Sequence, residues 1–149
     1  MINLEGKTVL VTGCSKGIGA AIVRSLGRAG AHVIAHYGSD QNGAEEAIAA
    51  IPRERKLLLQ ADFRDAQEVE RLWQAALAWR NRIDVLVNNA AVMLWNGGFD
   101  GAETAWDAVW EQTLKVNLLA PAKLMRHALR HFREKGGGVF VTISSWAAQ

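Results

Sequence analysis

A glycine-rich stretch near the N-terminus has the sequence Thr12-Gly13-Cys14-Ser15-Lys16-Gly17-Ile18-Gly19. It follows an apolar run at residues 9–11 and precedes a helical pattern that places Ile18, Ile22 and Leu26 on one face. Glycines let the backbone turn tightly and approach a ligand closely, and a helix N-terminus offers unpaired N–H groups and a partial positive charge. We therefore expect a phosphate-binding turn between a strand and a helix. A tight turn that binds no ligand is the alternative.

Five short apolar runs, continuous rather than alternating, predict strands that are covered on both faces, as in a parallel sheet. They span residues 9–11, 33–35, 57–59, 85–87 and 139–141. Besides the helix after the glycine-rich stretch, helical patterns lie between them at residues 41–51, 65–79 and about 103–135. This alternation predicts an α/β fold, a Rossmann-type doubly wound parallel sheet that is truncated after the fifth strand.

Three helix ends carry local signals. Gly30 stands where a left-handed cap would end the first helix, and the glycines at 136–138 would end the last one. Asp65 and Glu68 have the spacing of a capping box at the start of the helix expected at 65–79.

The composition is that of an ordinary globular domain. The 149 residues are 50% hydrophobic and 21% charged, and the net charge of +2 comes without a basic block. With a single cysteine and no apolar leader, we expect one cytoplasmic domain with no nucleic-acid or membrane partner. His127 and His131 lie one helical turn apart without an acidic or thiol partner, so we expect surface histidines and no metal site.

The glycine-rich stretch differs from the phosphate loop of ATPases, because Lys16 precedes the second glycine and no Ser or Thr follows it. Its spacing resembles the Thr-Gly-x-x-x-Gly-Ile-Gly loop of the short-chain dehydrogenase/reductase family at every fixed position. Further segments that resemble this family are Ala61-Asp62-Phe63, Asn88-Asn89-Ala90-Ala91, in which Ala91 replaces the usual glycine, Asn117, and Ile143-Ser144-Ser145. The resemblance covers the whole chain. It implies an NAD(P)-dependent oxidoreductase that moves a hydride between nicotinamide and a small carbonyl or alcohol substrate.

The resemblance also implies which residues form the site. Backbone groups of Gly13, Ser15, Ile18 and Gly19 would hold the pyrophosphate in a turn that includes Lys16 and Gly17, Asp62 and Phe63 would meet the adenine, and Asn89 and Ala90 would border the nicotinamide ribose. As catalytic residues, Ser145 would hydrogen-bond the substrate oxygen, with Ser144 as the alternative, and Asn117 would join a water-linked proton relay.

Pro121 lies four residues after Asn117 in an otherwise helical stretch. Proline cannot donate a hydrogen bond to the Asn117 carbonyl and clashes with it, so we expect a kink that leaves this carbonyl free. A free carbonyl suits the relay. A kink that only wraps the helix around the sheet is the alternative.

The end of the second expected strand bears on the choice between NAD and NADP. It has the sequence His36-Tyr37-Gly38-Ser39, without the acid that normally accepts from the free ribose hydroxyl of NAD. Asp40 follows, and we expect it to cap the next helix. Lys16 matches a position that is often basic in family members that prefer NADP. NADP is therefore the expected cofactor, with NAD as the alternative.

The family's proton donor is a Tyr followed four residues later by a Lys, and both come after the serine segment. The single tyrosine here, Tyr37, lies far upstream. We therefore expect a fragment of a longer enzyme that is homo-oligomeric when complete, with residues 139–143 as a bare apolar edge. The 149-residue chain alone is expected to be inactive, since general acid–base catalysis is lost. A non-catalytic nucleotide-binding or partner-binding module is the alternative.

Two tryptophans, Trp95 and Trp146, follow motifs that border the nicotinamide in the family. They are candidates for an apolar substrate wall, with simple core packing as the other interpretation.

Overall fold

The computed structural model describes residues 2–95 and 100–145. Five parallel strands form one sheet in the order β3-β2-β1-β4-β5. The strands are β1 (Thr8–Val11), β2 (His32–Tyr37), β3 (Lys56–Gln60), β4 (Val85–Asn88) and β5 (Val139–Thr142). Each contains one of the five apolar runs, so the predicted strands and the predicted parallel sheet are confirmed.

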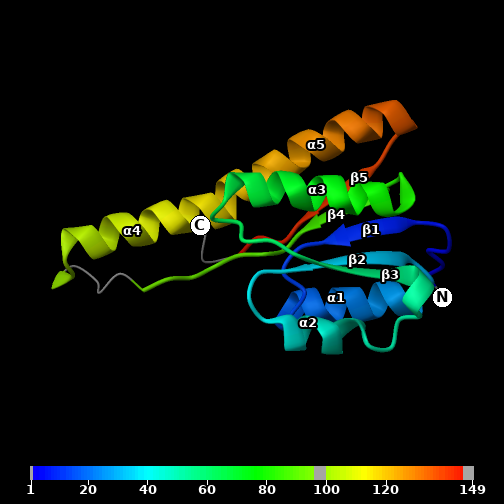
Figure 1. Ribbon diagram of the computed structural model, residues 1–149, viewed down its shortest axis with the longest axis horizontal. Coiled ribbons are helices and arrows are strands. Elements are labelled where there is room, and N and C mark those ends of the chain that lie inside the picture. The colour runs from blue at the N-terminus through cyan, green and yellow to red at the C-terminus, as the bar shows by residue number, and fades with distance from the viewer. Residues whose placement is uncertain (1, 96–99, 146–149) are drawn as a thin grey trace.

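Helices cover both faces of the sheet. On one face lie α1 (Gly17–Arg28) and α2 (Gln41–Ile48), and on the other lie α3 (Ala66–Arg80) and α5 (Ala120–Lys135), as Figure 1 shows. Successive strand residues point to opposite faces, so Leu10 belongs to the core under α3 and α5 while Val9 and Val11 belong to the core under α1 and α2. The sheet is therefore doubly wound, as predicted.

The strand order reverses between β1 and β4, because the chain returns from β3 across the sheet to pair β4 with β1. In open α/β sheets a ligand binds beyond the carboxyl ends of the strands at this switch point. The glycine-rich stretch directly follows β1 and lies at this point.

The long helical stretch is divided into α4 (Glu103–Leu114), a π-helical turn η3 (Lys115–Leu119) and α5. In Figure 1, α4 extends past the carboxyl ends of the strands. Pro121 is the second residue of α5, which continues directly from η3, and it has no N–H to donate to the preceding turn. The expected distortion near Asn117 is present, and it takes the form of a π turn rather than a simple kink.

Two helix ends match the glycine signals in the sequence, and one helix is shorter than predicted. Gly30 adopts φ +90° after α1 and Gly136 adopts φ +82° at the end of α5, as the cap signals predict. The predicted helix 41–51 ends earlier, at Ile48, because Ile51 turns back to pack against Gly27 of α1. The short 3-10 turn η1 (Arg53–Arg55) then leads into β3.

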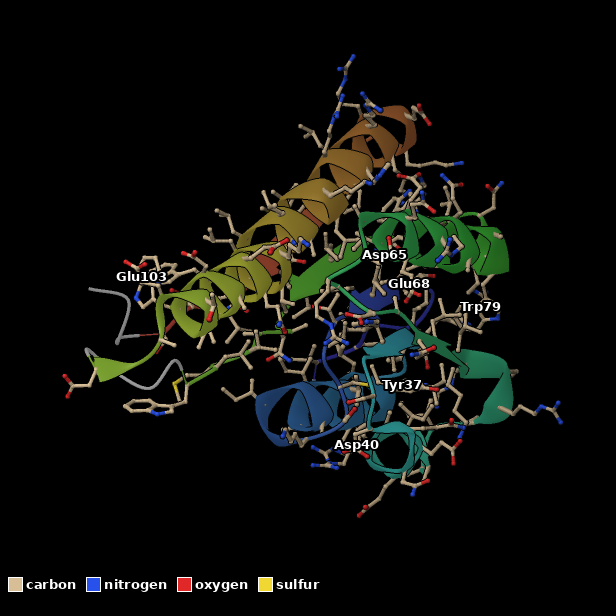
Figure 2. The ribbon with its side chains drawn as sticks, turned by 60° about the vertical axis from the view of Figure 1, so that its left-hand side comes forward. Tyr37, Asp40, Asp65, Glu68, Trp79 and Glu103 are labelled. Atoms are coloured by element: carbon tan, nitrogen blue, oxygen red, sulfur yellow. The ribbon has the colours of Figure 1, made fainter. Side chains whose placement is uncertain are left out.

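The capping box predicted at the start of α3 is only half formed. Asp65 accepts from the N–H of Gln67 at 2.7 Å, as an N-cap should. The Glu68 carboxylate does not complete the box, because it accepts from the N–H of Asp62 at 2.5 Å. Figure 2 shows Asp65 and Glu68 together at this helix end. Glu68 therefore anchors the segment that leaves β3.

The prediction of surface histidines is wrong for His131, which is 5% exposed. Its Nε2 accepts from the N–H of Ile83 at 3.1 Å, so the ring links α5 to the start of β4. Burial, together with Lys135 and Arg82, lowers the pKa of His131. Within residues 2–95 and 100–145, no three His, Cys, Asp or Glu side chains gather as metal ligands, and no helix is long and apolar enough to span a membrane.

Candidate nucleotide-binding site

The turn after β1 presents a helix N-terminus to the switch point. Gly13 and Gly17 have φ of +70° and +55°, in the left-handed region that glycine adopts without strain. Lys16 is the N-cap of α1 and gives no side-chain hydrogen bond to the first turn. The N–H groups that begin α1 therefore have no side-chain cap from Lys16, as a phosphate-binding turn requires.

The first and third glycines of the turn are needed for close packing. A Cβ on Gly13 would lie 2.7 Å from Cα of Ala90, and a Cβ on Gly19 would lie 2.0 Å from the carbonyl oxygen of Gly13 and 2.5 Å from Nδ2 of Asn89. Around Gly17 nothing lies within 4 Å. The turn is therefore tightly packed on the sheet side and open at its tip.

A hydrogen-bond network ties the turn to the end of β4. The hydroxyl of Thr12 accepts from the N–H groups of Asn89 and Ala90, both at 3.0 Å. The side-chain amide of Asn89 donates to the carbonyls of Thr12 and Gly13, both at 2.9 Å. The two segments that the family resemblance assigns to the cofactor thus form one rigid unit. Thr12 is a structural contributor that was not among the predicted site residues, although it stands directly before Gly13 in the motif.

The segment after β3 carries the residues predicted to meet adenine. Asp62 accepts a bidentate ion pair from Arg64, with the shortest contact at 2.5 Å. These hydrogen bonds from Arg64 hold the pKa of Asp62 below its usual value. Phe63 is 6% exposed and packs in the core, so Asp62 is the accessible side chain of the pair.

Beside these residues, β2 ends in His36, which is 2% exposed. Its Nδ1 accepts from the N–H of Gly13 at 3.2 Å, so that N–H points to the sheet. In the sequence, His36 stands out only as part of a strand end without an acid. The signal available there was a polar residue inside an otherwise apolar strand.

The first carboxylate after the end of β2 is that of Asp40, which lies at the start of α2. Asp40 caps α2 by accepting from the N–H of Gly43 at 2.9 Å, as predicted, and Ser15 donates to the carbonyl of Asp40 at 2.8 Å. Figure 2 shows Tyr37 and Asp40 near each other where β2 passes into α2. Lys16 is exposed on the neighbouring turn.

The predicted catalytic residues follow β4 and β5. The side chain of Asn117 is held at both ends by the backbone of Val92, which donates to Oδ1 and accepts from Nδ2, each at 2.8 Å. Ser145 is exposed just beyond β5, whose end is tied to β4 by the N–H of Ile143 donating to the carbonyl of Asn88 at 2.9 Å. Both residues therefore stand beyond the carboxyl ends of the strands.

Of the two tryptophans that are candidates for an apolar substrate wall, the structure describes only Trp95. Trp95 is 84% exposed, so simple core packing within the described residues does not account for it. Trp146 lies outside the described residues.

Cys14 fills space beneath the turn. The side chain is fully buried, and burial raises the pKa of its thiol to about 11. Although it lies close to a helix N-terminus, it is a packing residue in its thiol form.

Comparisons with known proteins agree with this geometry. The family model for short chain dehydrogenases matches residues 7–149. An uncharacterized oxidoreductase of Methylorubrum extorquens is 37% identical over 97% of this chain and 57% of its own length. The 3beta-hydroxysteroid dehydrogenase 1 of Eggerthella lenta is 36% identical over 96% of this chain and 54% of its own length.

A solved structure of a metagenomic short-chain oxidoreductase in complex with NADP has a TM-score of 0.84 and 34% identity, over 98% of this chain and 64% of that chain. The chain spans about half the length of the curated relatives it matches. The family match over almost the whole chain, together with the glycine turn at the switch point, shows that the chain belongs to the short-chain dehydrogenase/reductase family.

Proposed function

We propose that residues 1–149 form the nucleotide-binding part of an NAD(P)-dependent oxidoreductase that acts on a small carbonyl or alcohol. The observation that carries the proposal is the glycine turn, whose helix N-terminus has no side-chain cap and lies at the switch point of the sheet. When bound, the dinucleotide supplies the hydride donor or acceptor. The relatives named above, which include a steroid dehydrogenase, support this reaction class.

The roles proposed for the turn follow from its contacts. Ser15, Ile18 and Gly19 are the backbone positions assigned to the pyrophosphate, while Gly13 and Gly17 form the turn, since the N–H of Gly13 already donates to His36. Asn89 and Ala90 form the wall at the nicotinamide ribose, and Asp62 with Phe63 forms the adenine side. The Asp62 carboxylate would share its oxygens between Arg64 and the adenine amino group, because each oxygen accepts more than one hydrogen bond.

We also propose a preference for NADP over NAD. The capping bond of Asp40 uses the nearest carboxylate, and Lys16 offers a positive charge to a 2′-phosphate. The solved relative that contains NADP is consistent with this preference.

Titration calorimetry with NADP and NAD tests both proposals. The wild-type protein should bind NADP more tightly than NAD, and Lys16→Ala should weaken NADP selectively by about tenfold, as expected for one charge-assisted contact. Lys135→Ala, on the exposed end of α5, is the charge-matched control and should leave both affinities unchanged. An unchanged preference in Lys16→Ala would remove the argument for NADP, and no binding of either dinucleotide would remove the proposed function.

For the chemistry, we propose that Ser145 orients the substrate oxygen and that Asn117 contributes its main-chain carbonyl to a proton relay, because its side chain is held by Val92. The family's Tyr-x-x-x-Lys pair is not among the 149 residues, so we expect no turnover from them alone. Hydride transfer by the 149-residue protein, followed at the nicotinamide absorbance, would contradict the need for that pair.

We further propose that the enzyme is cytoplasmic and homo-oligomeric when complete.

A further inference from the structure

His36 joins two parts of the site that lie far apart in the sequence. It stands near the end of β2, between the turn that follows β1 and the segment that follows β3. Because its ring is buried, both ring nitrogens need protein partners. The two flanking segments supply one partner each.

The partners of His36 determine its tautomer. The N–H of Gly13 lies 3.2 Å from Nδ1, and the carbonyl oxygen of Ala61 lies 3.0 Å from Nε2. A backbone N–H only donates and a carbonyl only accepts, so Nδ1 carries no proton and Nε2 carries one. Burial lowers the pKa of His36 to about 4, with the Ala61 hydrogen bond acting in the opposite sense, and the ring is neutral at ordinary pH.

Two further contacts hold the same bridge. The ring of Phe63 stacks on the imidazole, with centroids 4.3 Å apart and planes inclined by 6°. On the other side, the N–H of Cys14 donates to the carbonyl of His36 at 2.9 Å. His36 therefore contacts the glycine turn through both its carbonyl and its ring, and the adenine-side segment through its ring.

We propose that His36 is a positioning residue that sets the distance between the glycine turn and the adenine-side segment by bridging Gly13 and Ala61 through its two ring nitrogens. It does not touch the nucleotide. The inference rests on the proposed nucleotide binding, since a dinucleotide must contact the turn with its pyrophosphate and the other segment with its adenine. A fixed spacing lowers the cost of ordering both segments when the ligand binds.

Three substitutions at His36 distinguish the hydrogen bond to Gly13 from the hydrogen bond to Ala61. His36→Asn keeps an acceptor near Cβ for Gly13 but is too short to reach Ala61. His36→Gln is one methylene longer, so it keeps a donor for Ala61 and loses the acceptor for Gly13. His36→Phe keeps an aromatic ring and removes both bonds.

The matched control is His32→Phe, at the other end of β2, where the ring contacts Trp79 with centroids 6.2 Å apart. Each variant is checked for folding by circular dichroism and titrated with NADP, with ADP and with inorganic pyrophosphate. ADP spans both segments, whereas pyrophosphate needs only the turn.

We expect His36→Asn and His36→Gln each to weaken NADP and ADP about fivefold, and His36→Phe to weaken them about 25-fold if the two bonds act independently. His36→Asn should leave pyrophosphate binding unchanged, because its turn contact remains, while His36→Gln should weaken it. His32→Phe should change none of these affinities. The nitrogen-15 spectrum of the wild-type imidazole should show a proton on Nε2 and none on Nδ1.

Three results would overturn the inference: affinities within twofold of wild type in His36→Phe, equal losses for ADP and pyrophosphate in His36→Asn, or a proton on Nδ1. If His36→Phe fails to fold, the two single-bond variants decide. A wild-type protein that binds neither dinucleotide would reject this inference together with the proposed function. Normal wild-type binding with unchanged variants would reject the role of His36 alone.

Discussion

The glycine turn and strand β5 belong to the same sheet but differ in how their residues are covered. Around the turn, the hydrogen bonds between Asn89 and Thr12 and the bond from the N–H of Gly13 to His36 tie the backbone to β4 and to β2. Along β5, Val139, Phe140 and Val141 are 53%, 38% and 40% exposed. The predicted apolar edge is thus present in the described part of the chain. The difference teaches that the proposed nucleotide site is held by contacts within the described residues, whereas β5 presents an apolar edge that these residues do not cover.

The largest loss of nucleotide affinity and stability should come from placing a side chain at Gly19 in the glycine turn. Gly19→Val would place side-chain atoms on the carbonyl of Gly13 and on Asn89, so we expect nucleotide affinity to fall by about 100-fold and stability by about 3 kcal/mol. Calorimetry and urea unfolding measure the two losses. Gly27→Ala is the control, because its Cβ meets only the side chain of Ile51 at the far end of α1. That control should lower stability and spare affinity, and equal affinity losses in both variants would mean that the turn has no special role.

The next effect concerns the bond between the turn and β4. Thr12→Val has nearly the same shape but leaves the N–H groups of Asn89 and Ala90 without their acceptor, which should lower the free energy of unfolding by about 2 kcal/mol. Thr12→Ser keeps the hydroxyl and should retain most of the stability. Urea unfolding of the pair gives the comparison. If Ser and Val behave alike, the hydroxyl does not tie the two segments together.

Three valines that lie side by side on neighbouring strands allow the stability of the strands near the turn to be compared with that of β5. Val11, Val87 and Val141 are neighbours across β1, β4 and β5, with exposed fractions of 0%, 4% and 40%. Substitution by Ala should cost about 2 kcal/mol at Val11 and Val87 and about 0.5 kcal/mol at Val141, since burial sets the loss. Thermal unfolding measures the series. A cost at Val141 equal to that at Val87 would show that something covers β5 in solution.

The smallest effect is a change in pH dependence at His131. The folded protein lowers its pKa below the ordinary 6.5, so the unfolded chain binds the proton more readily. The stability that neutral His131 contributes is therefore complete above pH 6.5 and is lost as the pH falls toward its folded pKa. His131→Gln can still accept from Ile83 and does not titrate, so its free energy of unfolding should fall less between these pH values. Identical slopes for wild type and variant would assign the pH dependence to other groups.

The sequence predicted the sheet because its signals are local. Continuous apolar runs located the five strands, and Gly30 and Gly136 marked helix ends that the structure confirms. The position of the glycine turn at the switch point followed from the strand before it and the helix after it.

The features that were missed depend on distant contacts. Burial of His131 requires the N–H of Ile83, 48 residues away, and the bridge at His36 requires Ala61, 25 residues away. Glu68 accepts from the N–H of Asp62, while its expected capping partner, the N–H of Asp65, donates to the carbonyl of Asp62. Spacing within one helix cannot reveal such partners, since packing between elements selects them.

The burial of Cys14 gives the turn a built-in chemical reporter. As the single cysteine of the chain, with a thiol that is fully buried and has a pKa of about 11, it can react with an alkylating reagent only when the turn opens. At low reagent concentration the labelling rate then equals the intrinsic thiol rate multiplied by the fraction of open molecules. Slower labelling with added nucleotide would give the free energy by which the ligand holds the turn shut, without any introduced probe.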